Sequence, residues 1–167
     1  MQEKLQKLLF YCYLISLVWI LLFKMSISGD DLRAIMGTRY LNLIPFGEPT
    51  KVNGTFNWTE VINNCLIFLP FGGLLSIISN RTFGQKILLI VSFSIIIECL
   101  QYLLQLGRTD ITDVLTNSLG GVMGLLAYSG LNNIFEKKKL DIVLTYIGGI
   151  LFICALLFIA ILIVSNL

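Results

Sequence analysis

The sequence contains no histidine and few charged residues. Without histidine, the chain cannot form a His-ligated zinc site, a serine–histidine pair or any site with histidine as acid or base. Charged residues make up 13% of the chain, about half the ~25% that is usual in soluble domains. Hydrophobic residues make up 56%, and the mean hydropathy is +0.86. This balance excludes an ordinary soluble domain and indicates an integral membrane protein.

Short motifs for cofactors and metals are also missing. There is no Cys-x-x-Cys pair, and the four cysteines (Cys12, Cys65, Cys99 and Cys154) fall in apolar stretches, where we interpret them as small packing residues. Phosphate-binding loops and nucleotide-binding glycine patterns are absent. The basic run Lys137–Lys139 is only three residues long, so it favours a role in membrane orientation over nucleic-acid binding. We therefore expect no cofactor and no nucleic-acid partner.

Five apolar stretches are long enough to cross a bilayer, whose ~30 Å hydrocarbon layer needs about 20 helical residues. We predict an all-α bundle of about five transmembrane helices in a single domain, residues 1–167. The predicted spans are residues 8–25, 61–79, 87–106, 111–128 and 142–164, with a long loop at 26–60. The first is expected to be a retained helix and not a cleaved signal peptide, because its apolar run is long. The fourth is the least apolar, so protein must cover its polar face.

The distribution of lysine and arginine predicts the orientation. Cytoplasmic loops carry an excess of basic residues. Basic residues crowd the short segments on one side: Lys4, Lys7, Arg81, Lys86 and Lys137–Lys139. On the other side most are diluted among acidic residues in the long loop: Lys24, Arg33, Arg39, Lys51 and Arg108. We therefore predict that the N-terminus lies inside the cell and the C-terminus outside, with loop 26–60 on the outer side.

Polar side chains interrupt the third and fourth spans at helical spacing. Glu98, Gln101 and Gln105 fall at positions i, i+3 and i+7, which share one face of a helix. The same offsets recur in a second set, which is Asp110, Asp113 and Asn117. A turn at residues 106–109 makes the two helices antiparallel neighbours, so the polar faces can meet. Because a carboxylate within a span costs about 2.5–3.5 kcal/mol, such residues are functional candidates.

Other polar residues are expected at the same level of the membrane. With a rise of 1.5 Å per residue, Glu98 lies roughly 12 Å and Asn117 roughly 9 Å from the outer end of its span. Asn64, near the outer end of the second span, faces the same region, and the apolar segment Asn42–Phe46 of the outer loop lies above it. That segment is typical of an interfacial stretch or of a lid that packs on the bundle. We therefore predict a polar pocket in the outer half of the membrane.

Charge and glycine patterns refine this pocket. We expect Arg108 to pair with Asp110, Asp113 or an anionic ligand, because Glu98 is ten positions away. Glu98, Asp110 and Asp113 could ligate a hard cation, but the adjacent Arg108 argues against a metal, and we predict none. Gly120 and Gly124 form a small-xxx-small pair that favours close helix packing. The first and fifth spans, without interior charges, are expected to cover the others.

Taken in order, these motifs resemble the VanZ family of bacterial membrane proteins. The motifs are Asn42-Leu-Ile-Pro-Phe46, Asn64 with Phe68-Leu-Pro-Phe-Gly72, Glu98-Cys-Leu-Gln101, and residues 108–121 with Arg108, Asp110, Asp113 and Asn117. The resemblance covers most of the chain and departs from the family pattern at no motif position. It implies a location in the bacterial cell membrane and a role in reduced susceptibility to the glycopeptide teicoplanin. It implies no particular biochemical reaction.

Three classes of function remain open at this stage. The first, which we favour, is a protein that binds or modulates a membrane lipid, a lipid-linked cell-wall precursor or teicoplanin at the outer leaflet. The second is an intramembrane enzyme with Glu98 or Asp113 as acid or base, disfavoured by the absence of a nucleophile motif. The third is a small transporter, disfavoured by the absence of duplicated halves. The expected ligand-binding residues are Asn42, Pro45, Phe46, Asn64, Glu98, Gln101, Arg108, Asp110, Asp113 and Asn117.

Overall fold

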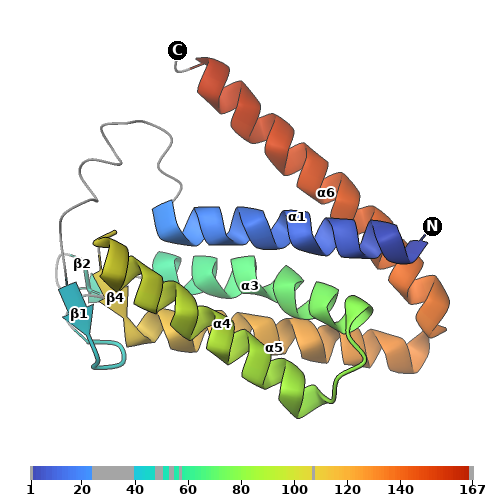
Figure 1. Ribbon diagram of the computed structural model, residues 1–167, viewed down its shortest axis with the longest axis horizontal. Helices are drawn as coiled ribbons and strands as arrows, with labels where there is room; N and C mark the ends of the chain where they lie inside the picture. Colours follow the sequence, from blue (N-terminus) through green and yellow to red (C-terminus); the bar gives the residue numbers. More distant parts are fainter. Residues whose placement is uncertain are drawn as a thin grey trace.

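The computed structural model describes residues 2–23, 40–47, 51–52, 55–56, 58–106 and 108–165. These residues contain five long helices, which form the body of the molecule in Figure 1. The helices are α1 (Gln2–Phe23), α3 (Trp58–Ile78), α4 (Phe83–Leu104), α5 (Ile111–Ile134) and α6 (Lys137–Ser165). All five are long and apolar enough to cross a membrane. The prediction of a five-span helical membrane protein is therefore confirmed.

The helices differ from the predicted spans mainly at their ends. Helices α1, α4 and α6 begin four to six residues earlier than predicted, because each helix includes polar residues at its N-terminal end. Helix α4 begins directly after its N-cap, Thr82, which forms a capping box with Gln85. At its other end α4 stops at Leu104, and Gln105 adopts the left-handed conformation with φ 55°. Gln105 is thus part of a helix cap, and the polar stripe on α4 ends at Gln101.

Two short strand pairs depart from the prediction of an all-α chain. β1 (Tyr40–Asn42) pairs in parallel with β4 (Arg108–Asp110), and β2 (Lys51–Val52) pairs antiparallel with β3 (Thr55–Phe56). Backbone N–H and C=O groups away from water need partners. Pairing β1 with β4 supplies them for the chain that enters α5. The segment between α1 and α3 is therefore hydrogen-bonded to the bundle at this point.

Helices α3 and α5 pack most extensively, and α5 is the most enclosed helix. In its most apolar 18-residue stretch, 44% of the residues are buried, against at most 28% in the other helices. Glycine permits the close approach: a Cβ atom on Gly120 would lie 2.2 Å from the carbonyl oxygen of Cys65. A Cβ atom on Gly124 would lie 2.0 Å from the carbonyl oxygen of Leu69. The predicted packing role of this glycine pair is confirmed.

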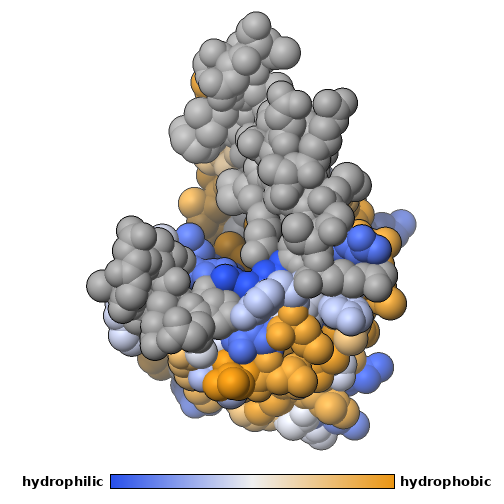
Figure 2. All heavy atoms as spheres, turned by 90° about the vertical axis from the view of Figure 1, so that its left-hand side faces the viewer, coloured by the Kyte–Doolittle hydropathy of each residue, from blue (hydrophilic) through white to orange (hydrophobic). Residues whose placement is uncertain are grey.

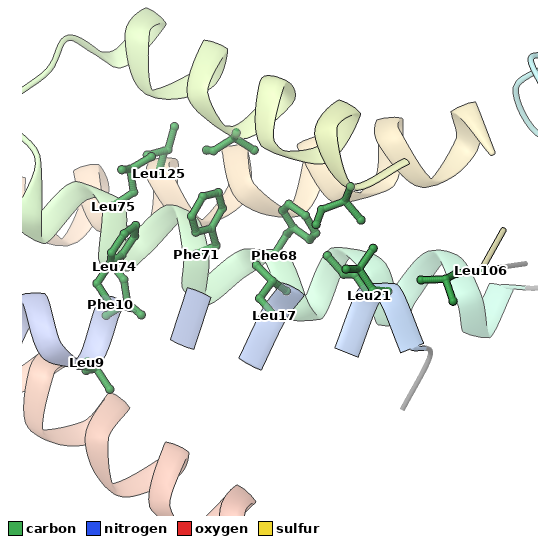
Figure 3. Packing of buried hydrophobic residues seen from close by; sticks show 13 residues of the cluster. Leu9, Phe10, Leu17, Leu21, Phe68, Phe71, Leu74, Leu75, Leu106 and Leu125 are labelled. Atoms are coloured by element: carbon green, nitrogen blue, oxygen red, sulfur yellow. The ribbon is translucent and has the colours of Figure 1, made fainter. Parts of the chain in front are cut away.

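The apolar core lies between α1, α3 and α4. Leu17 and Leu21 of α1 approach Phe68 and Phe71 of α3 (Figure 3), and Phe68 is fully buried. The hydroxyl of Tyr13 on α1 also donates to the carbonyl of Ile67, in the turn of α3 that precedes a proline. One face of α1 therefore packs into the core while the opposite face is exposed, as Leu8 (60%) and Ile15 (70%) show, which is compatible with its expected role as a covering helix. Helix α6 diverges from the bundle (Figure 1), and only 11% of its apolar stretch is buried.

Different residues and elements lie at the two ends of the bundle. At one end, the N-terminal turn of α1, the α3–α4 connection and the start of α6 meet around a cavity of about 300 Å³, lined in part by Lys7, Asn80 and Lys137. At the other end lie the β1–β4 pair and the starts of α3 and α5 (Figure 1). The structure thus groups the basic residues predicted to lie inside at one end. The candidate site lies toward the opposite end.

Candidate functional site

A cavity of about 620 Å³ lies between α1, α3, α4 and α5. This volume is within the range of about 300–1,000 Å³ that small-molecule sites occupy. Both polar and aliphatic side chains line it. The lining residues are Ile20, Leu21, Thr59, Glu60, Asn63, Asn64, Leu66, Ile67, Glu98, Gln101, Asp113 and Asn117. Seen from the end that carries β1 and β4, the described surface has a band of hydrophilic residues beside a broad hydrophobic area (Figure 2).

Glu98 links α4 to the start of α5. Its Oε2 accepts a hydrogen bond of 2.9 Å from the backbone N–H of Asp110. The hydroxyl of Thr109 donates to the backbone carbonyl of Glu98 at 3.3 Å. Glu98 is only 5% exposed. Since α4 ends at Leu104, Glu98 lies about 9 Å from the helix end, closer than the predicted 12 Å. Its bond to Asp110 places it level with the start of α5, whereas Asn117 lies level with Ser94.

Asp113 joins α5 to α3. Its Oδ1 accepts a hydrogen bond of 2.8 Å from the side-chain amide of Asn64. The same amide donates to Thr116 Oγ1 at 3.3 Å, and the thiol of Cys65 donates to the Thr116 carbonyl at 3.2 Å. The predicted approach of Asn64 to the acidic face of α5 is therefore confirmed.

Two further amides complete the polar wall of the cavity. Gln101 is 3% exposed, and its Nε2 donates to the backbone carbonyl of Leu21 at 2.9 Å. Asn117 is 1% exposed, and its Nδ2 donates to the hydroxyl of Ser94 at 3.1 Å. These bonds tie α4 to α1 and α5 to α4. Hydrogen bonds therefore connect four helices around one cavity, with α1 taking part through the backbone carbonyl of Leu21.

Asn42 and Asp110 hold the segment that contains β1 on the bundle. Asp110 is fully buried and caps α5, because its Oδ1 accepts a hydrogen bond of 2.8 Å from the backbone N–H of Thr112. The amide of Asn42 donates to the same oxygen at 2.9 Å and to the carbonyl of Ile44 at 3.0 Å. The N–H of Phe46 donates to Thr112 Oγ1 at 2.9 Å. We call this set of residues, Asn42–Phe46 with Asp110 and Thr112, the clasp.

The clasp turns apolar side chains outward. Leu43 is 68% and Ile44 is 70% exposed, while the backbone beside them is hydrogen-bonded to α5 through Phe46. The segment thus combines both predicted properties: it packs on the bundle through its polar atoms and presents an apolar surface. Such a surface fits the membrane interface.

Arg108 pairs chiefly with a residue that the sequence analysis did not place in the pocket. One of its Nη atoms lies 3.3 Å from each carboxylate oxygen of Glu60, on α3. Its Nε lies 3.8 Å from Asp110 Oδ2. The predicted pairing with Asp110 is thus present at longer range, and Glu60 is the additional partner. The signal that could have found Glu60 is its i, i+4 spacing to Asn64, which places both side chains on one face of α3.

The ten predicted site residues therefore form two groups. Five line the cavity: Asn64, Glu98, Gln101, Asp113 and Asn117. The other five lie in or beside the clasp: Asn42, Pro45, Phe46, Arg108 and Asp110. Ser94 and Thr112, which complete the hydrogen-bond network, were not predicted. Nothing in the sequence distinguishes their hydroxyls from the other serine and threonine hydroxyls in apolar helices. The loop residues Arg33 and Arg39 lie outside the described residues.

Within the described part of the chain, no group of three or more cysteine and acidic residues is arranged to hold a metal ion. Glu98, Asp110 and Asp113 are engaged with N–H donors from the backbone and from amide side chains. Carboxylates in such positions act as hydrogen-bond acceptors. The arrangement can therefore recognise polar groups, and three carboxylates, those of Glu60, Glu98 and Asp113, line the cavity.

Fold and site together define a multi-pass helical membrane protein with a buried polar cluster. A family model described as VanZ/LLP1 matches residues 10–136. The chain is 36% identical over 149 residues to Protein VanZ of Enterococcus faecium, a match that covers 87% of both chains. The chain therefore belongs to the VanZ/LLP1 family. No solved structure matches it.

Proposed function

We propose that this protein lowers susceptibility to teicoplanin by binding or modulating an envelope component at the outer leaflet of the bacterial cell membrane. The component is a membrane lipid, a lipid-linked cell-wall precursor or the drug itself. The cavity between α1, α3, α4 and α5 is the proposed binding site. Membership of the VanZ/LLP1 family and the 36% identity to Protein VanZ support the resistance role.

The observation that carries the binding proposal is the lining of the cavity. Five residues predicted from the sequence line one cavity, together with the aliphatic residues Ile20, Leu21, Leu66 and Ile67. Buried carboxylates are costly in a membrane and mark functional sites by default. A wall of this composition suits an amphiphile, whose polar part contacts Glu98 and Asp113 and whose chain contacts Leu66 and Ile67.

The proposed location at the outer leaflet rests on the predicted orientation. The basic residues Lys7 and Lys137 meet at the end of the bundle away from the cavity, and an excess of such residues favours the cytoplasmic side. The cavity then lies in the outer half of the membrane. The apolar residues Leu43 and Ile44 of the clasp lie at the outer interface.

A second candidate function is catalysis on a lipid-linked substrate. The observation in its favour is that two carboxylates, Glu98 and Asp113, line the same cavity. Paired carboxylates can divide the roles of acid and base. Turnover of lipid-linked wall precursors by the purified protein would distinguish this enzyme from a binding protein.

The proposed function is tested by expression in a susceptible Gram-positive host. Teicoplanin carries an acyl tail that anchors it at the membrane, whereas vancomycin has none. A protein that acts at the membrane face should raise the inhibitory concentration of teicoplanin and leave that of vancomycin nearly unchanged. Equal protection against both drugs would indicate altered wall precursors.

The role of the cavity is tested in the same host with a blocking variant. Leu66 lines the cavity and is 58% exposed, so Leu66→Trp fills space without touching the polar network. Leu126 on α5 is 56% exposed, and Leu126→Trp is the matched control away from the cavity. We expect the first variant to lose protection and the second to keep it, at equal protein levels. If both variants protect, or if neither does, blocking the cavity has no effect of its own on protection. Either result would remove the cavity from the proposal.

A further inference from the structure

Two amide oxygens in the cavity wall have no hydrogen-bond partner among the described residues. They are Oε1 of Gln101 and Oδ1 of Asn117. Both side chains line the cavity, and they are 3% and 1% exposed. A buried acceptor without a partner costs about 1–3 kcal/mol, so such atoms call for a donor that the ligand can bring.

The identity of the Gln101 atom is set by its surroundings. The amide of Gln101 faces the backbone carbonyl of Leu21 at 2.9 Å. A carbonyl oxygen only accepts hydrogen bonds, so the nitrogen of the amide must face it. The oxygen of Gln101 is therefore the atom without a hydrogen-bond partner. Asn117 faces Ser94, whose hydroxyl can donate or accept.

The other polar groups of the wall add to this excess of acceptors. Glu60, Glu98 and Asp113 contribute carboxylates, which only accept when ionised. The donors on the wall come from Asn63, Asn64 and Thr59. An ionised phosphate or carboxylate brings further acceptors and no donors, so it would leave the oxygens of Gln101 and Asn117 without partners. A hydroxyl both donates and accepts, and it can meet both kinds of group.

We propose that the cavity takes a neutral headgroup rich in hydroxyls, a sugar attached to an apolar chain, and that it disfavours anionic headgroups. The sugar hydroxyls would donate to Gln101 Oε1 and Asn117 Oδ1 and to the carboxylates. The chain would lie along Ile20, Leu66 and Ile67, which also line the cavity. This assignment rests on the cavity being the binding site of the proposed function, and it names the class of ligand.

The test uses the full-length protein in nanodiscs. One set contains phosphatidylcholine alone, and three others contain a minor fraction of a monoglucosyl diacylglycerol, of phosphatidylglycerol or of a diacyl lipid with an ammonium headgroup. We expect the glucolipid to raise Tm by about 5 °C, the size that near-saturating binding gives a chain of this length. Phosphatidylglycerol and the ammonium lipid should leave Tm near that in phosphatidylcholine. Native mass spectrometry should find one glucolipid retained per chain.

Variants connect the shift to the cavity. Asn117→Leu removes one unpaired oxygen, and Leu66→Trp blocks the space while it keeps every polar atom. Both should lose the glucolipid shift, and Leu126→Trp should keep it. If Asn117→Leu does not fold, Leu66→Trp still decides the question. A soluble methyl glucoside, added to phosphatidylcholine discs, shows whether the sugar alone suffices or the attached chain is required.

Several results would overturn the assignment. An equal or larger shift with phosphatidylglycerol would make this an anion site, and a larger shift with the ammonium lipid would make it a cation site. A glucolipid shift that survives Leu66→Trp would place binding elsewhere, and no shift would mean that this headgroup does not bind. None of these assays contains an antibiotic, whereas the susceptibility test contains no added lipid. The ligand class and the resistance role therefore fail separately.

Discussion

Asp110 is the residue through which the outer loop, α4 and α5 are connected. Its carboxylate caps α5 and accepts the amide of Asn42, while its backbone N–H donates to Glu98. Sequence spacing placed Asp110 on the polar face of α5, as a site residue. In the structure Asp110 is the fully buried N-cap of α5, and it does not itself line the cavity.

A first prediction compares two helix caps. Asp110→Ala removes the cap of α5 and the bond to Asn42, whereas Thr82→Ala removes only the exposed cap of α4. Loss of a cap costs about 0.5–2 kcal/mol, and a buried partner left without its bond costs about 1–3 kcal/mol more. We expect Asp110→Ala to lower Tm clearly more than Thr82→Ala in the purified protein. Equal losses would mean that the clasp contributes little.

A second prediction separates charge from scaffold in the cavity. Glu98→Gln and Asp113→Asn each keep an oxygen for the donors that they now bind, the N–H of Asp110 and the amide of Asn64. They remove the charge, so a bound ligand that donates to these residues would be held less strongly, because hydrogen bonds to ionised groups are about twice as strong as bonds to neutral groups. We expect both variants to lose protection against teicoplanin at near-normal Tm and protein level.

The control for this comparison is Glu136→Gln, which removes an exposed carboxylate paired with Lys139 away from the cavity. It should keep protection. If the Glu98 and Asp113 variants protect as well as this control, the acidic residues serve as scaffold. The same conclusion would follow if protection falls only in step with protein level.

At the scale of elements, the α3–α5 pair depends on glycine. Besides Gly120 and Gly124, a Cβ atom on Gly72 would lie 1.9 Å from the carbonyl oxygen of Gly121. Small residues let two backbones approach closely, which is the main way that helices associate in lipid. Because Asn64 and Asp113 lie on these two helices, the distance between them depends on this contact.

A third prediction follows from the glycine contact. Gly120→Ala places a methyl group where Cys65 backbone atoms lie within 2.2–2.8 Å, so α3 and α5 must separate. Gly73→Ala, on α3, meets nothing within 4 Å, and alanine favours helix by up to about 1 kcal/mol over glycine. We expect Gly120→Ala to lower Tm by several degrees and Gly73→Ala to leave it equal or higher. A small effect of Gly120→Ala would show that the helices adjust at little cost.

At the scale of the whole molecule, orientation decides which face of the membrane the cavity serves. The charge pattern predicts the N-terminus inside, and the structure places Lys7 and Lys137 together at one end. The clasp lies at the other end, with Leu43 largely exposed. These two ends therefore offer well-separated positions for labelling.

A fourth prediction states the expected labelling. Single cysteines at Tyr40 and Leu43, in a variant without the four native cysteines, should react with an impermeant thiol reagent in intact cells. Cysteines at Gly84 and Lys138 should react only after the membrane is opened. Labelling of position 138 in intact cells would reverse the orientation and move the cavity to the inner leaflet. Protein that keeps its protection against teicoplanin provides the control for native folding.

Much of the architecture and of the cavity was determined by the sequence alone. Apolar runs of sufficient length made five membrane helices necessary, because a helix satisfies its own backbone in lipid. Helical spacing identified Glu98, Gln101, Asp113 and Asn117 as one polar surface, and the small-xxx-small pattern predicted the contact at Gly120. These are local properties, since the period of a helix fixes which side chains share a face.

Only the tertiary structure decided which partner each polar group finds. Arg108 meets Glu60 across 48 positions of sequence, and Asn42 meets Asp110 across 68. Gln101 donates to the backbone of Leu21, a carbonyl that no side-chain pattern reveals. Such bonds form because buried donors and acceptors must be paired by whatever the packing of distant segments brings near. The same packing leaves the oxygens of Gln101 and Asn117, two residues that line the cavity, without hydrogen-bond partners among the described residues, and spacing along the chain could not predict that.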